Sequence, residues 1–591
     1  MKKGKDREFK KLKEQIVNIG VLVKNSKGNS LFEQEITLRK KIKMLKSMKD
    51  KGFKGYKDVY CSYLETFKLV SKKIIDDYNR KNAADFSFED IVKEDYEGFI
   101  KSGILSVLLT KHIPKILERE FDKAFPKNPK DEYKGARDIK RKFYLHLGDT
   151  NTGKTHNALE ALKRGTKGVY LSPLRILAME NCEKLNSQGI ITDLITGEEE
   201  DLKEGATHLC CTIEKLNVDE EYDVTVVDEV QMIASDLRGA AWTRAILGTR
   251  SKEIHVCGAL NAKDILISII QDCGDEYEIR EYKRDIPLIV EDKSFRLKDI
   301  KDGDGLVVFS KRKVLEIAKY FSEKGIGTSV IYGDLPPEVR KKQYQDFISG
   351  KNTVLITTDA IGMGVNLPLR RIVFMDVRKF DGNQVRTLSS QEIKQIAGRA
   401  GRKGIYEEGF VTAYGDNIDF IRHNIEVKDG KIWEGVLGPG EQITKIKNIS
   451  LKDKLALWSI RYMEGKLYKK MDISEYLIKL ENLNCYKLPQ ETQWKLMKIP
   501  FDVSERDLMV TFLNYIDEIF IAKKKELSKP RNFINELTDW ELYYQKINIY
   551  YSFGKIFEVN IDEKWIREER ADVGERINKI LGDIKKDIFI I

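Results

Sequence analysis

The chain has 591 residues, of which 41% are hydrophobic and 34% charged, and its formal net charge is +10. A chain of this length exceeds what one hydrophobic core supports, so we expect several domains. No apolar run is long enough to span a bilayer, and the N-terminus lacks the apolar core of a secretory signal. Both features argue against a membrane protein and against a secreted one.

The positive charge is concentrated at the N-terminus. Residues 1–54 contain seventeen Lys/Arg and six Asp/Glu, a surplus of eleven, so the remainder of the chain is close to neutral. A local basic segment often contacts nucleic acid or another polyanion. A merely solvated lysine-rich helix has the same composition, and both interpretations stay open.

Two features bear on the cellular compartment. Asp6, Glu8 and Glu14 argue against an organelle transit peptide, which is poor in acidic residues. The seven cysteines form no C-x-x-C pair and have no histidine at zinc spacing, which is typical of reduced, buried thiols. The sequence therefore predicts a cytoplasmic protein.

Four regions follow one another along the chain. Residues 1–140 are rich in lysine and place apolar residues at helical spacing. Residues 141–284 alternate short apolar strands, such as "FYLHL", "GVYLS" and "DVTVVD", with helices, and residues 285–435 repeat this alternation. Such alternation is typical of parallel sheets with flanking helices. Residues 436–591 are again helical, so we predict two tandem α/β domains with a cleft between them and a helical region on either side.

The stretch "HLGDTNTGKTHNAL" contains a phosphate-binding loop, G-x-x-x-x-G-K-T, between a predicted strand and a predicted helix. Backbone N–H groups of such a loop cradle phosphates, its lysine neutralises the outer phosphates and its threonine hydroxyl holds Mg²⁺. We therefore predict an ATP site with bound Mg²⁺ formed by Gly148, Asp149, Thr150, Asn151, Thr152, Gly153, Lys154 and Thr155.

A second acidic element follows the apolar strand in "YDVTVVDEVQMI". Phosphoryl-transfer enzymes of this type need a carboxylate at the end of a neighbouring strand to position Mg²⁺, and a base that orients the attacking water. We expect Asp228 to hold the metal together with Thr155, and Glu229 to orient and deprotonate the water.

The second α/β domain has no phosphate loop of its own but contains "QEIKQIAGRAGRKG". If this segment forms a helix and its end, Gln395, Arg399 and Arg402 are spaced by four and three residues and lie on one face. Arginines that face a γ-phosphate across a cleft stabilise the charge of the transition state. We expect these three residues to act in catalysis, while binding of a surface carboxylate is the simpler alternative.

The ordered motif set resembles the superfamily-two DExH-type RNA helicases. The motifs are "GDTNTGKT", "SPLR", "CTIEKL", "DEVQ", "TTDAIGMGVNLP" and "QIAGRAGR". The phrases "SPLRILAMEN" and "YGDLPPEVR" and the glutamine of the Asp-Glu-x-Gln box resemble more narrowly the mitochondrial degradosome RNA helicases and their bacterial relatives. The resemblance implies two tandem RecA-like parallel-sheet domains that form an ATP cleft, flanked by helical N- and C-terminal regions.

The resemblance also assigns binding residues. It implies that Asp359 and Gly362 meet the nucleotide, and that the nucleic-acid backbone is contacted by Ser172, Pro173, Arg175, Thr212, Thr357 and Thr358. One departure concerns "CGALN" at 257–261, where the family usually has Gly-Glu after the third strand. That element couples hydrolysis to strand movement in the family.

The implied activity is an ATP-dependent RNA helicase that moves 3′ to 5′ on a single strand and unwinds duplexes. The alternatives are an ATPase that remodels RNA–protein complexes without processive unwinding, and a nucleic-acid-binding scaffold with a weak motor. Expected partners are single-stranded and duplex RNA, with DNA and an exoribonuclease as further candidates. Related helicases read adenine with a glutamine before the phosphate loop, and none occurs between Gln34 and Gln188, so we expect other nucleoside triphosphates to be accepted.

Asp381-Gly382 in "FMDVRKFDGNQVRTLSS" predicts a two-residue hairpin turn. In related motors a hairpin at this place splits the strands. Arg378, Lys379 and Arg386 favour contact with nucleic acid here, and a hairpin that merely edges the sheet is the alternative.

Overall fold

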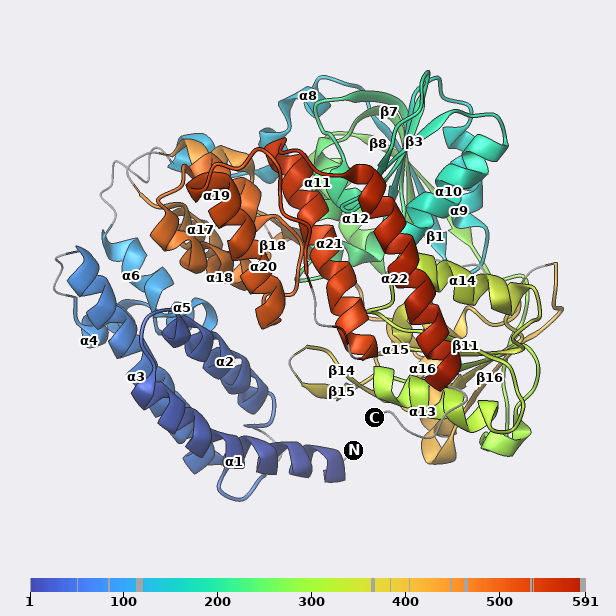
Figure 1. The fold of residues 1–591 in the computed structure, drawn as a ribbon, viewed down its shortest axis with the longest axis horizontal. Helices are drawn as coiled ribbons and strands as arrows, with labels where there is room; N and C mark the ends of the chain where they lie inside the picture. Colours follow the sequence, from blue (N-terminus) through green and yellow to red (C-terminus); the bar gives the residue numbers. More distant parts are fainter. Residues whose placement is uncertain are drawn as a thin grey trace. The chain divides into compact units, whose positions relative to one another are not determined.

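The computed structural model describes residues 2–49, 52–82, 86–112, 121–362, 367–382, 384–402, 404–446, 449–461, 466–531, 534 and 536–584. These residues form two compact units (Figure 1). The first unit comprises Met1–Glu132, Gly438–Gly465 and Lys470–Ile499, and the second comprises Tyr133–Leu437, Lys466–Lys469 and Pro500–Ile591. The helical region that we expected over 436–591 is therefore divided between the two units.

The first unit is mainly helical, as the composition of residues 1–140 predicted. In α1, Phe9, Leu12 and Val23 are buried at helical spacing, whereas Lys10 and Lys13 are exposed. The basic surplus of this segment therefore lies on a solvated face of a packed helix. The α-helices of the unit are α1 (Lys2–Asn25), α2 (Asn29–Lys46), α3 (Tyr56–Asn82), α4 (Phe88–Glu94), α5 (Tyr96–Ser102), α6 (Ile104–His112), α17 (Leu451–Ile460), α18 (Ser474–Leu483) and α19 (Gln490–Met497).

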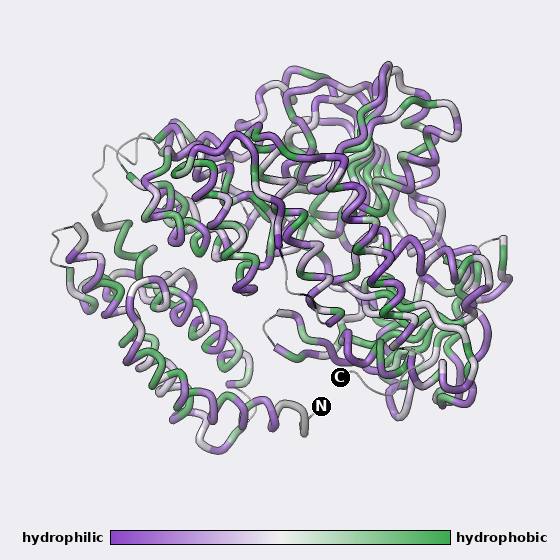
Figure 2. Tube along the Cα trace, viewed as in Figure 1, coloured by the Kyte–Doolittle hydropathy of each residue, from purple (hydrophilic) through white to green (hydrophobic). Residues whose placement is uncertain are grey.

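The second unit contains two parallel sheets, which confirms the predicted α/β class. The larger sheet has the order β4-β3-β5-β2-β6-β7-β1-β8 in the described residues, and only β4 runs antiparallel to its neighbour. Strands buried on both faces are rich in apolar residues, and Figure 2 shows hydrophobic residues along the inner strands of this sheet. Its strands are β1 (Lys142–Gly148), β2 (Gly168–Ser172), β3 (Thr192–Ile195), β4 (Glu200–Asp201), β5 (His208–Thr212), β6 (Glu221–Val227), β7 (Arg250–Gly258) and β8 (Glu276–Tyr282). The helices are α8 (Lys134–Arg137), α9 (Lys154–Leu162), α10 (Arg175–Ser187), α11 (Gly239–Gly248) and α12 (Lys263–Asp272).

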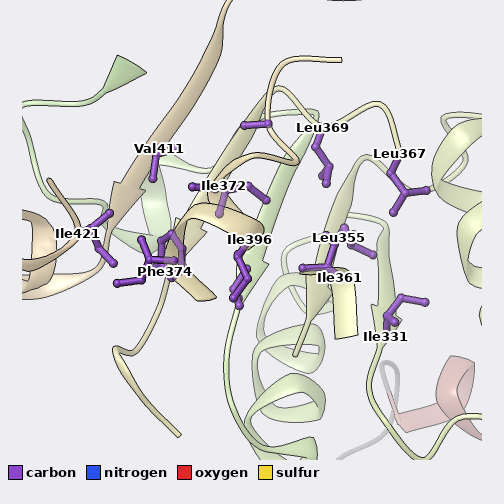
Figure 3. Close-up of a cluster of buried hydrophobic side chains, with 14 of the residues drawn as sticks. Ile331, Leu355, Ile361, Leu367, Leu369, Ile372, Phe374, Ile396, Val411 and Ile421 are labelled. Atoms are coloured by element: carbon purple, nitrogen blue, oxygen red, sulfur yellow. The ribbon is translucent and has the colours of Figure 1, made fainter. Parts of the chain in front are cut away.

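The smaller sheet has the order β11-β12-β10-β13-β16-β9, and all its described pairs are parallel. Figure 3 shows its core, where Leu355 of β12 and Ile372 and Phe374 of β13 meet Ile396 of α15. The strands are β9 (Leu288–Val290), β10 (Asp304–Val307), β11 (Thr328–Ile331), β12 (Val354–Thr357), β13 (Arg371–Phe374) and β16 (Gly409–Ala413). The helices are α13 (Lys311–Ser322), α14 (Pro337–Ile348), α15 (Ser390–Ala397) and α16 (Ile418–Glu426).

The last helices of the chain belong to the same unit as the two sheets. They are α20 (Arg506–Ile516), α21 (Leu537–Phe557) and α22 (Glu563–Ile584), and α22 packs along both α21 and α14. There are also two small two-stranded sheets. One pairs β14 (Arg378–Phe380) with β15 (Val385–Thr387), and the other pairs β17 (Gly435–Leu437) with β18 (Tyr468–Lys470). None of the helices in the described ranges combines the length and the apolar character that crossing a bilayer requires.

Candidate nucleotide-binding site

The phosphate loop connects β1 to α9, as the motif predicted. A Cβ atom at Gly148 would lie 2.0 Å from the carbonyl oxygen of Tyr282 on the adjacent strand β8, so only glycine fits there. Gly153 precedes α9 with a φ of 79°, and Asn151 has a φ of 63°. These left-handed residues wind the loop around the N-terminus of α9, where unpaired N–H groups attract an anion.

The Lys154 side chain folds back over the loop. Its Nζ donates to the Gly148 carbonyl at 3.0 Å and also to the Asp149 carbonyl. Burial lowers the pKa of Lys154, and the carboxylates of Glu229 and Asp228 oppose this shift. The ammonium group is therefore held where the outer phosphates of a nucleotide would lie.

Thr155 and Asp228 lie side by side. The Thr155 hydroxyl donates to the two Asp228 carboxylate oxygens at 3.2 and 3.3 Å, and the Tyr170 hydroxyl donates to Oδ2 at 2.8 Å. Burial, and then the neighbouring Glu229, raise the pKa of Asp228 to about 6. A hydroxyl and a carboxylate are hard oxygen donors suited to Mg²⁺, which prefers one or two carboxylates together with phosphate oxygens. The donor set fits the predicted metal.

Glu229 has a left-handed backbone with a φ of 52°. This turn separates its carboxylate from that of Asp228, although the two residues are consecutive. The Gln231 side chain holds Glu229 from one side, because its amide donates to the Glu229 carboxylate and its oxygen accepts from the Ala259 N–H at 3.1 Å. A strained residue kept in place by its neighbours is typical of an active site.

The arginines of the second sheet lie beyond the helix that was expected to carry them. Helix α15 ends at Ala397 with Gly398 as its cap, so the shared helical face proposed for Gln395, Arg399 and Arg402 does not extend to the two arginines. The turn after the helix aims Arg399 instead. Its Nη2 lies 3.9 Å from Glu229 Oε1 and donates to the Gly362 carbonyl at 2.7 Å.

The surroundings of Arg399 suit a charge-stabilising role. The side chain is 13% exposed, and burial lowers the pKa of the guanidinium while Glu229 and Asp228 raise it. Gln395 approaches Gly362, since a Cβ there would lie 3.7 Å from Gln395 Cγ. Arg402 is partly buried in the following turn. Of the three predicted residues, Arg399 is the one that the structure brings to the Asp-Glu pair.

The phosphate loop touches the arginine-bearing turn directly. Asn151 Nδ2 donates to the Gly401 carbonyl at 3.3 Å, and a Cβ at Gly398 would lie 2.6 Å from Thr150 Cβ. Arg284, in the connection between the two sheets, donates to the Gly398 carbonyl at 2.8 Å and also to that of Ala400. The two α/β domains are therefore closed upon each other at the nucleotide site.

The expected nucleotide contacts from the second domain lie in one turn, Asp359–Gly362. Gly362 accepts the hydrogen bond from Arg399, which places it at the site. The Asp359 carboxylate is 44% exposed and pairs with Lys379 at 2.8 Å. Residues 363–366 of the same motif lie outside the described residues.

Most of the expected nucleic-acid contacts are buried loop residues. Ser172 Oγ donates to the Leu174 carbonyl at 2.7 Å, and Thr357 Oγ1 donates to the Thr358 carbonyl at 3.0 Å. The Pro173 carbonyl accepts from Arg238 at 2.7 Å, and Thr212 is half-buried at the end of β5. The hydroxyls of Ser172 and Thr357 therefore shape their own turns.

Arg175 differs from the expectation. Its guanidinium is 11% exposed and pairs with Glu198 at 2.6 Å and Glu199 at 2.9 Å. Although burial lowers the pKa of Arg175, Tyr544 and the surrounding carboxylates raise it above its ordinary value. A guanidinium already surrounded by carboxylates is not available to a nucleic-acid phosphate, so the role predicted for Arg175 is not supported by its surroundings.

The predicted hairpin is present as β14 and β15, and its basic residues are largely neutralised. Lys379 pairs with Asp359 and Glu392, and Arg386 pairs with Glu392 at 2.8 Å and Asp381 at 3.0 Å. The argument that this charge is free for nucleic acid is therefore wrong for Lys379 and Arg386. The hairpin also exposes apolar side chains, because Phe380 and Val385, which face each other across it, are 62% and 56% exposed.

Sequence reasoning missed three residues that build the site. Tyr170 supports Asp228, and Arg284 supports the turn that carries Arg399. Tyr282 supports the phosphate loop through its backbone. Tyr170 follows from its place on β2, which neighbours the strand ending in Asp228. Nothing in the local sequence marks Tyr282 or Arg284, because their partners are distant along the chain.

Two protein-family models match this chain. The DEXQ-box helicase domain of Suv3 matches residues 129–282, and the helicase conserved C-terminal domain matches residues 292–404. In structure, the chain is similar to Saccharomyces cerevisiae Dbp5 bound to RNA and ADP BeF3, with a TM-score of 0.39 and 17% identity, over 56% of this chain and 95% of that one.

Curated relatives match in sequence. The rice "ATP-dependent RNA helicase SUV3L, mitochondrial" is 44% identical over 299 residues, which cover 49% of this chain and 40% of that protein. The Candida albicans "ATP-dependent RNA helicase SUV3, mitochondrial" is 38% identical over 412 residues, with 68% and 53% covered. The zebrafish "ATP-dependent RNA helicase SUPV3L1, mitochondrial" is 32% identical over 484 residues, with 76% and 63% covered.

These relatives bear on extent, compartment and family. The chain spans about half the length of the curated relatives it matches. All three are named mitochondrial, so the expectation of a cytoplasmic protein is wrong. Residues 129–282 and 292–404 carry a Suv3-type DEXQ-box helicase domain followed by a helicase conserved C-terminal domain, which confirms the family resemblance that the motifs indicated.

Proposed function

We propose that this chain is an ATP-dependent RNA helicase that moves 3′ to 5′ on a single strand and unwinds duplexes. The observation that carries the proposal is the 3.9 Å approach of Arg399 to Glu229 across two α/β domains. Hydrolysis that needs an arginine from the opposite domain is coupled to closing and opening of the cleft, as a motor requires. The names of the curated relatives agree with this activity.

In the proposed reaction each residue of the cleft has one task. The loop Gly148–Thr155 binds the phosphates, and Lys154 neutralises them. Thr155 and Asp228 would hold Mg²⁺, which would neutralise the negative charge that develops on the phosphates. Glu229 orients the attacking water and accepts its proton.

Arg399 donates to the oxygens of the transferred phosphoryl group, with Arg402 and Gln395 placed beside it. Asp359 and Gly362 complete the nucleotide contacts. The absence of a glutamine before the loop supports acceptance of other nucleoside triphosphates besides ATP.

For the nucleic acid, we propose contact by the loops at Ser172-Pro173, Thr212 and Thr357-Thr358. The Thr212 hydroxyl and the N-terminus of α10, which follows Ser172-Pro173, can donate to phosphates without reading bases, which suits a helicase that acts on many sequences. The hairpin with Phe380 and Val385 at its exposed edge is the proposed strand separator. Residues 141–284 and 285–435 are the proposed motor domains. An exoribonuclease and DNA remain candidate partners.

The deciding experiment measures ATP hydrolysis with and without single-stranded RNA and single-stranded DNA, beside unwinding of duplexes with 3′ or 5′ tails. We expect stimulation by RNA and unwinding of the 3′-tailed duplex only. Hydrolysis stimulated by RNA without unwinding would favour the second candidate, a remodelling ATPase. The observation that favours this second candidate is Ala259, which stands where the family usually has the glutamate that couples the two activities.

A further inference from the structure

Arg175 lies where three parts of the second unit meet. It is the first residue of α10 and pairs with Glu198 and Glu199 of the same α/β domain. Its Nη2 also lies 3.5 Å from Oε1 of Glu338, which stands in the first turn of α14 in the other domain. Its Nη1 donates to the hydroxyl of Tyr544 on α21 at 3.4 Å. One buried guanidinium therefore joins both α/β domains to the C-terminal helices.

Tyr544 completes the connection. Its hydroxyl donates to Glu338 Oε2 at 2.7 Å, and burial raises the pKa of Tyr544, so the hydroxyl keeps the proton that it donates. Arg570 on α22 donates to the Glu198 carbonyl at 2.7 Å and lies 5.8 Å from the Tyr544 ring centre. Glu338 thus accepts from α21 and pairs with α10 at the same time.

The charge balance makes this network depend on domain closure. Three carboxylates, each about one third exposed, surround the Arg175 guanidinium, and like charges held close together without a cation repel each other. Glu198 and Glu199 move with Arg175, whereas Glu338 moves with the second domain. Opening the cleft would separate Glu338 from Arg175, whereas Tyr544 stands on α21, which also contacts the second domain because Glu541 accepts from Tyr332 at 2.7 Å. The contact between Glu338 and Arg175 is therefore made in the closed arrangement, and the Tyr544 hydroxyl orients Glu338 for it.

A packed path leads from this network to the nucleotide site. Ile176 and Leu177, the residues that follow Arg175, belong to one buried hydrophobic cluster with Tyr344 of α14 and Ile396 of α15. Helix α15 ends two residues before Arg399. The loop at 172–174, proposed above to contact nucleic acid, enters α10 directly at Arg175. A shift of α10 would therefore displace both Glu338 and α15.

We propose that Arg175 and Tyr544 are positioning residues that link occupancy of the nucleic-acid loop to the closed placement of Arg399. This inference rests on the proposed function and deepens it. By this account the Arg175 of "SPLR" does not contact the nucleic-acid backbone. It holds Glu338 and Tyr544 so that RNA binding at the preceding loop and closure of the cleft favour each other.

The test replaces Tyr544 by Phe and uses Tyr543→Phe as the matched control. Tyr543 is the neighbouring tyrosine of α21, and its hydroxyl donates to Glu569 of α22 at 2.9 Å, within the C-terminal helices. Both variants lose one hydroxyl bonded to one glutamate. ATP hydrolysis is measured over a range of single-stranded RNA concentrations, with thermal melting in parallel.

We expect Tyr544→Phe to raise the half-saturating RNA concentration about two- to tenfold, the effect of one hydrogen bond. Turnover at saturating RNA and the KM for ATP should stay near those of the wild type. Tyr543→Phe should lower the melting temperature comparably and leave the RNA curve unchanged. Glu338→Gln, which keeps the side-chain shape and removes the charge that Arg175 faces, should reproduce the effect of Tyr544→Phe.

Superimposable RNA curves for Tyr544→Phe, Glu338→Gln and the wild type would overturn the inference. So would an equal shift in Tyr543→Phe, because the effect would then follow from lost stability. If the wild type itself shows no stimulation by RNA, the proposed function fails, and the linkage fails with it. A wild type that is stimulated and variants that are unchanged separate the two cases.

Discussion

The side-chain oxygen of Gln231 accepts a hydrogen bond from the backbone N–H of Ala259 at 3.1 Å. The amide of the same side chain donates to the Glu229 carboxylate. Gln231 therefore ties the proposed water-activating residue to the turn after β7. This turn is where the chain departs from the family, and a link to it persists through the backbone N–H, which any residue except proline would supply at position 259.

Replacing Gln231 by Ala should release Glu229 from this tie. We expect turnover to fall about tenfold while the KM for ATP changes little, since the phosphate loop is untouched and only the orientation of the base is lost. Steady-state kinetics with saturating RNA measure both constants. A large rise in KM with normal turnover would show that Gln231 serves nucleotide binding instead.

Glu229→Gln should bind ATP with near-normal affinity and hydrolyse it about 10²- to 10⁴-fold more slowly, because Asp228 and Thr155 still hold the metal while the proton acceptor is gone. Lys154→Ala is the contrasting variant and should lose nucleotide binding as well. Equilibrium binding of a fluorescent nucleotide, beside turnover, separates the two. Near-normal turnover in Glu229→Gln would refute the assignment of the base.

Arg399→Ala should lower turnover far more than nucleotide affinity. Arginines of this kind contribute about 10³- to 10⁵-fold in other phosphoryl-transfer systems and act mainly on the transition state. Arg402→Ala should have a smaller effect, because the described contact with Glu229 is that of Arg399. The measurement is single-turnover hydrolysis at saturating ATP. Unchanged single-turnover rates with weakened binding would restrict Arg399 to ground-state contacts.

The sequence motifs were sufficient to predict the parts of the site that are short continuous stretches of the chain. The loop at 148–155 and the Asp228-Glu229 pair follow strands whose apolar runs are unmistakable, and the structure brings them together. Strand β8 was missed because its sequence, "EYEIREY", alternates charged residues at a sheet edge and lacks an apolar run. Its Tyr282 nevertheless closes the back of the phosphate loop.

Arg175 shows a second limit of sequence reasoning. The motif "SPLR" correctly indicates a loop at the end of β2, but the chemistry of its arginine is set by residues far along the chain. Tyr544 is 369 residues away, and Glu338 lies in the other domain. Only the folded arrangement shows that the carboxylates of Glu198, Glu199 and Glu338 surround the guanidinium.

Buried histidines beside the phosphate loop predict sensitivity to acid. His146 Nε2 and His255 Nδ1 are 2.9 Å apart, and burial, followed by neighbouring cations, lowers the pKa of each to about 4. The unfolded chain takes up protons near pH 6.5, so the free energy of unfolding should fall as the pH falls from about 6.5 towards 4.

Thermal melting at a series of pH values tests this expectation. His255→Gln should flatten the dependence in that window, whereas His156→Gln, at a histidine whose side chain is 60% exposed, should not change it. A slope that survives His255→Gln unchanged would assign the acid sensitivity to other groups.

Variants of the hairpin formed by β14 and β15 should separate ATP hydrolysis from duplex unwinding most clearly. The charges of Lys379 and Arg386 are held in ion pairs, whereas the apolar side chains of Phe380 and Val385 are exposed. An apolar pair facing solvent can unstack the terminal base pair of a duplex. These two residues are not part of the nucleotide site.

Phe380→Ser with Val385→Ser leaves the ion pairs in place. We expect RNA-stimulated hydrolysis to remain within about twofold of the wild type, and unwinding of a 3′-tailed duplex to fall about tenfold or more, since base stacking on one aromatic ring contributes about 1–3 kcal/mol. Arg378→Ala is the control, because this neighbouring side chain is also exposed but carries charge instead of apolar surface. If the double variant unwinds normally, the strands are parted elsewhere, and if Arg378→Ala alone abolishes unwinding, the hairpin acts through charge after all.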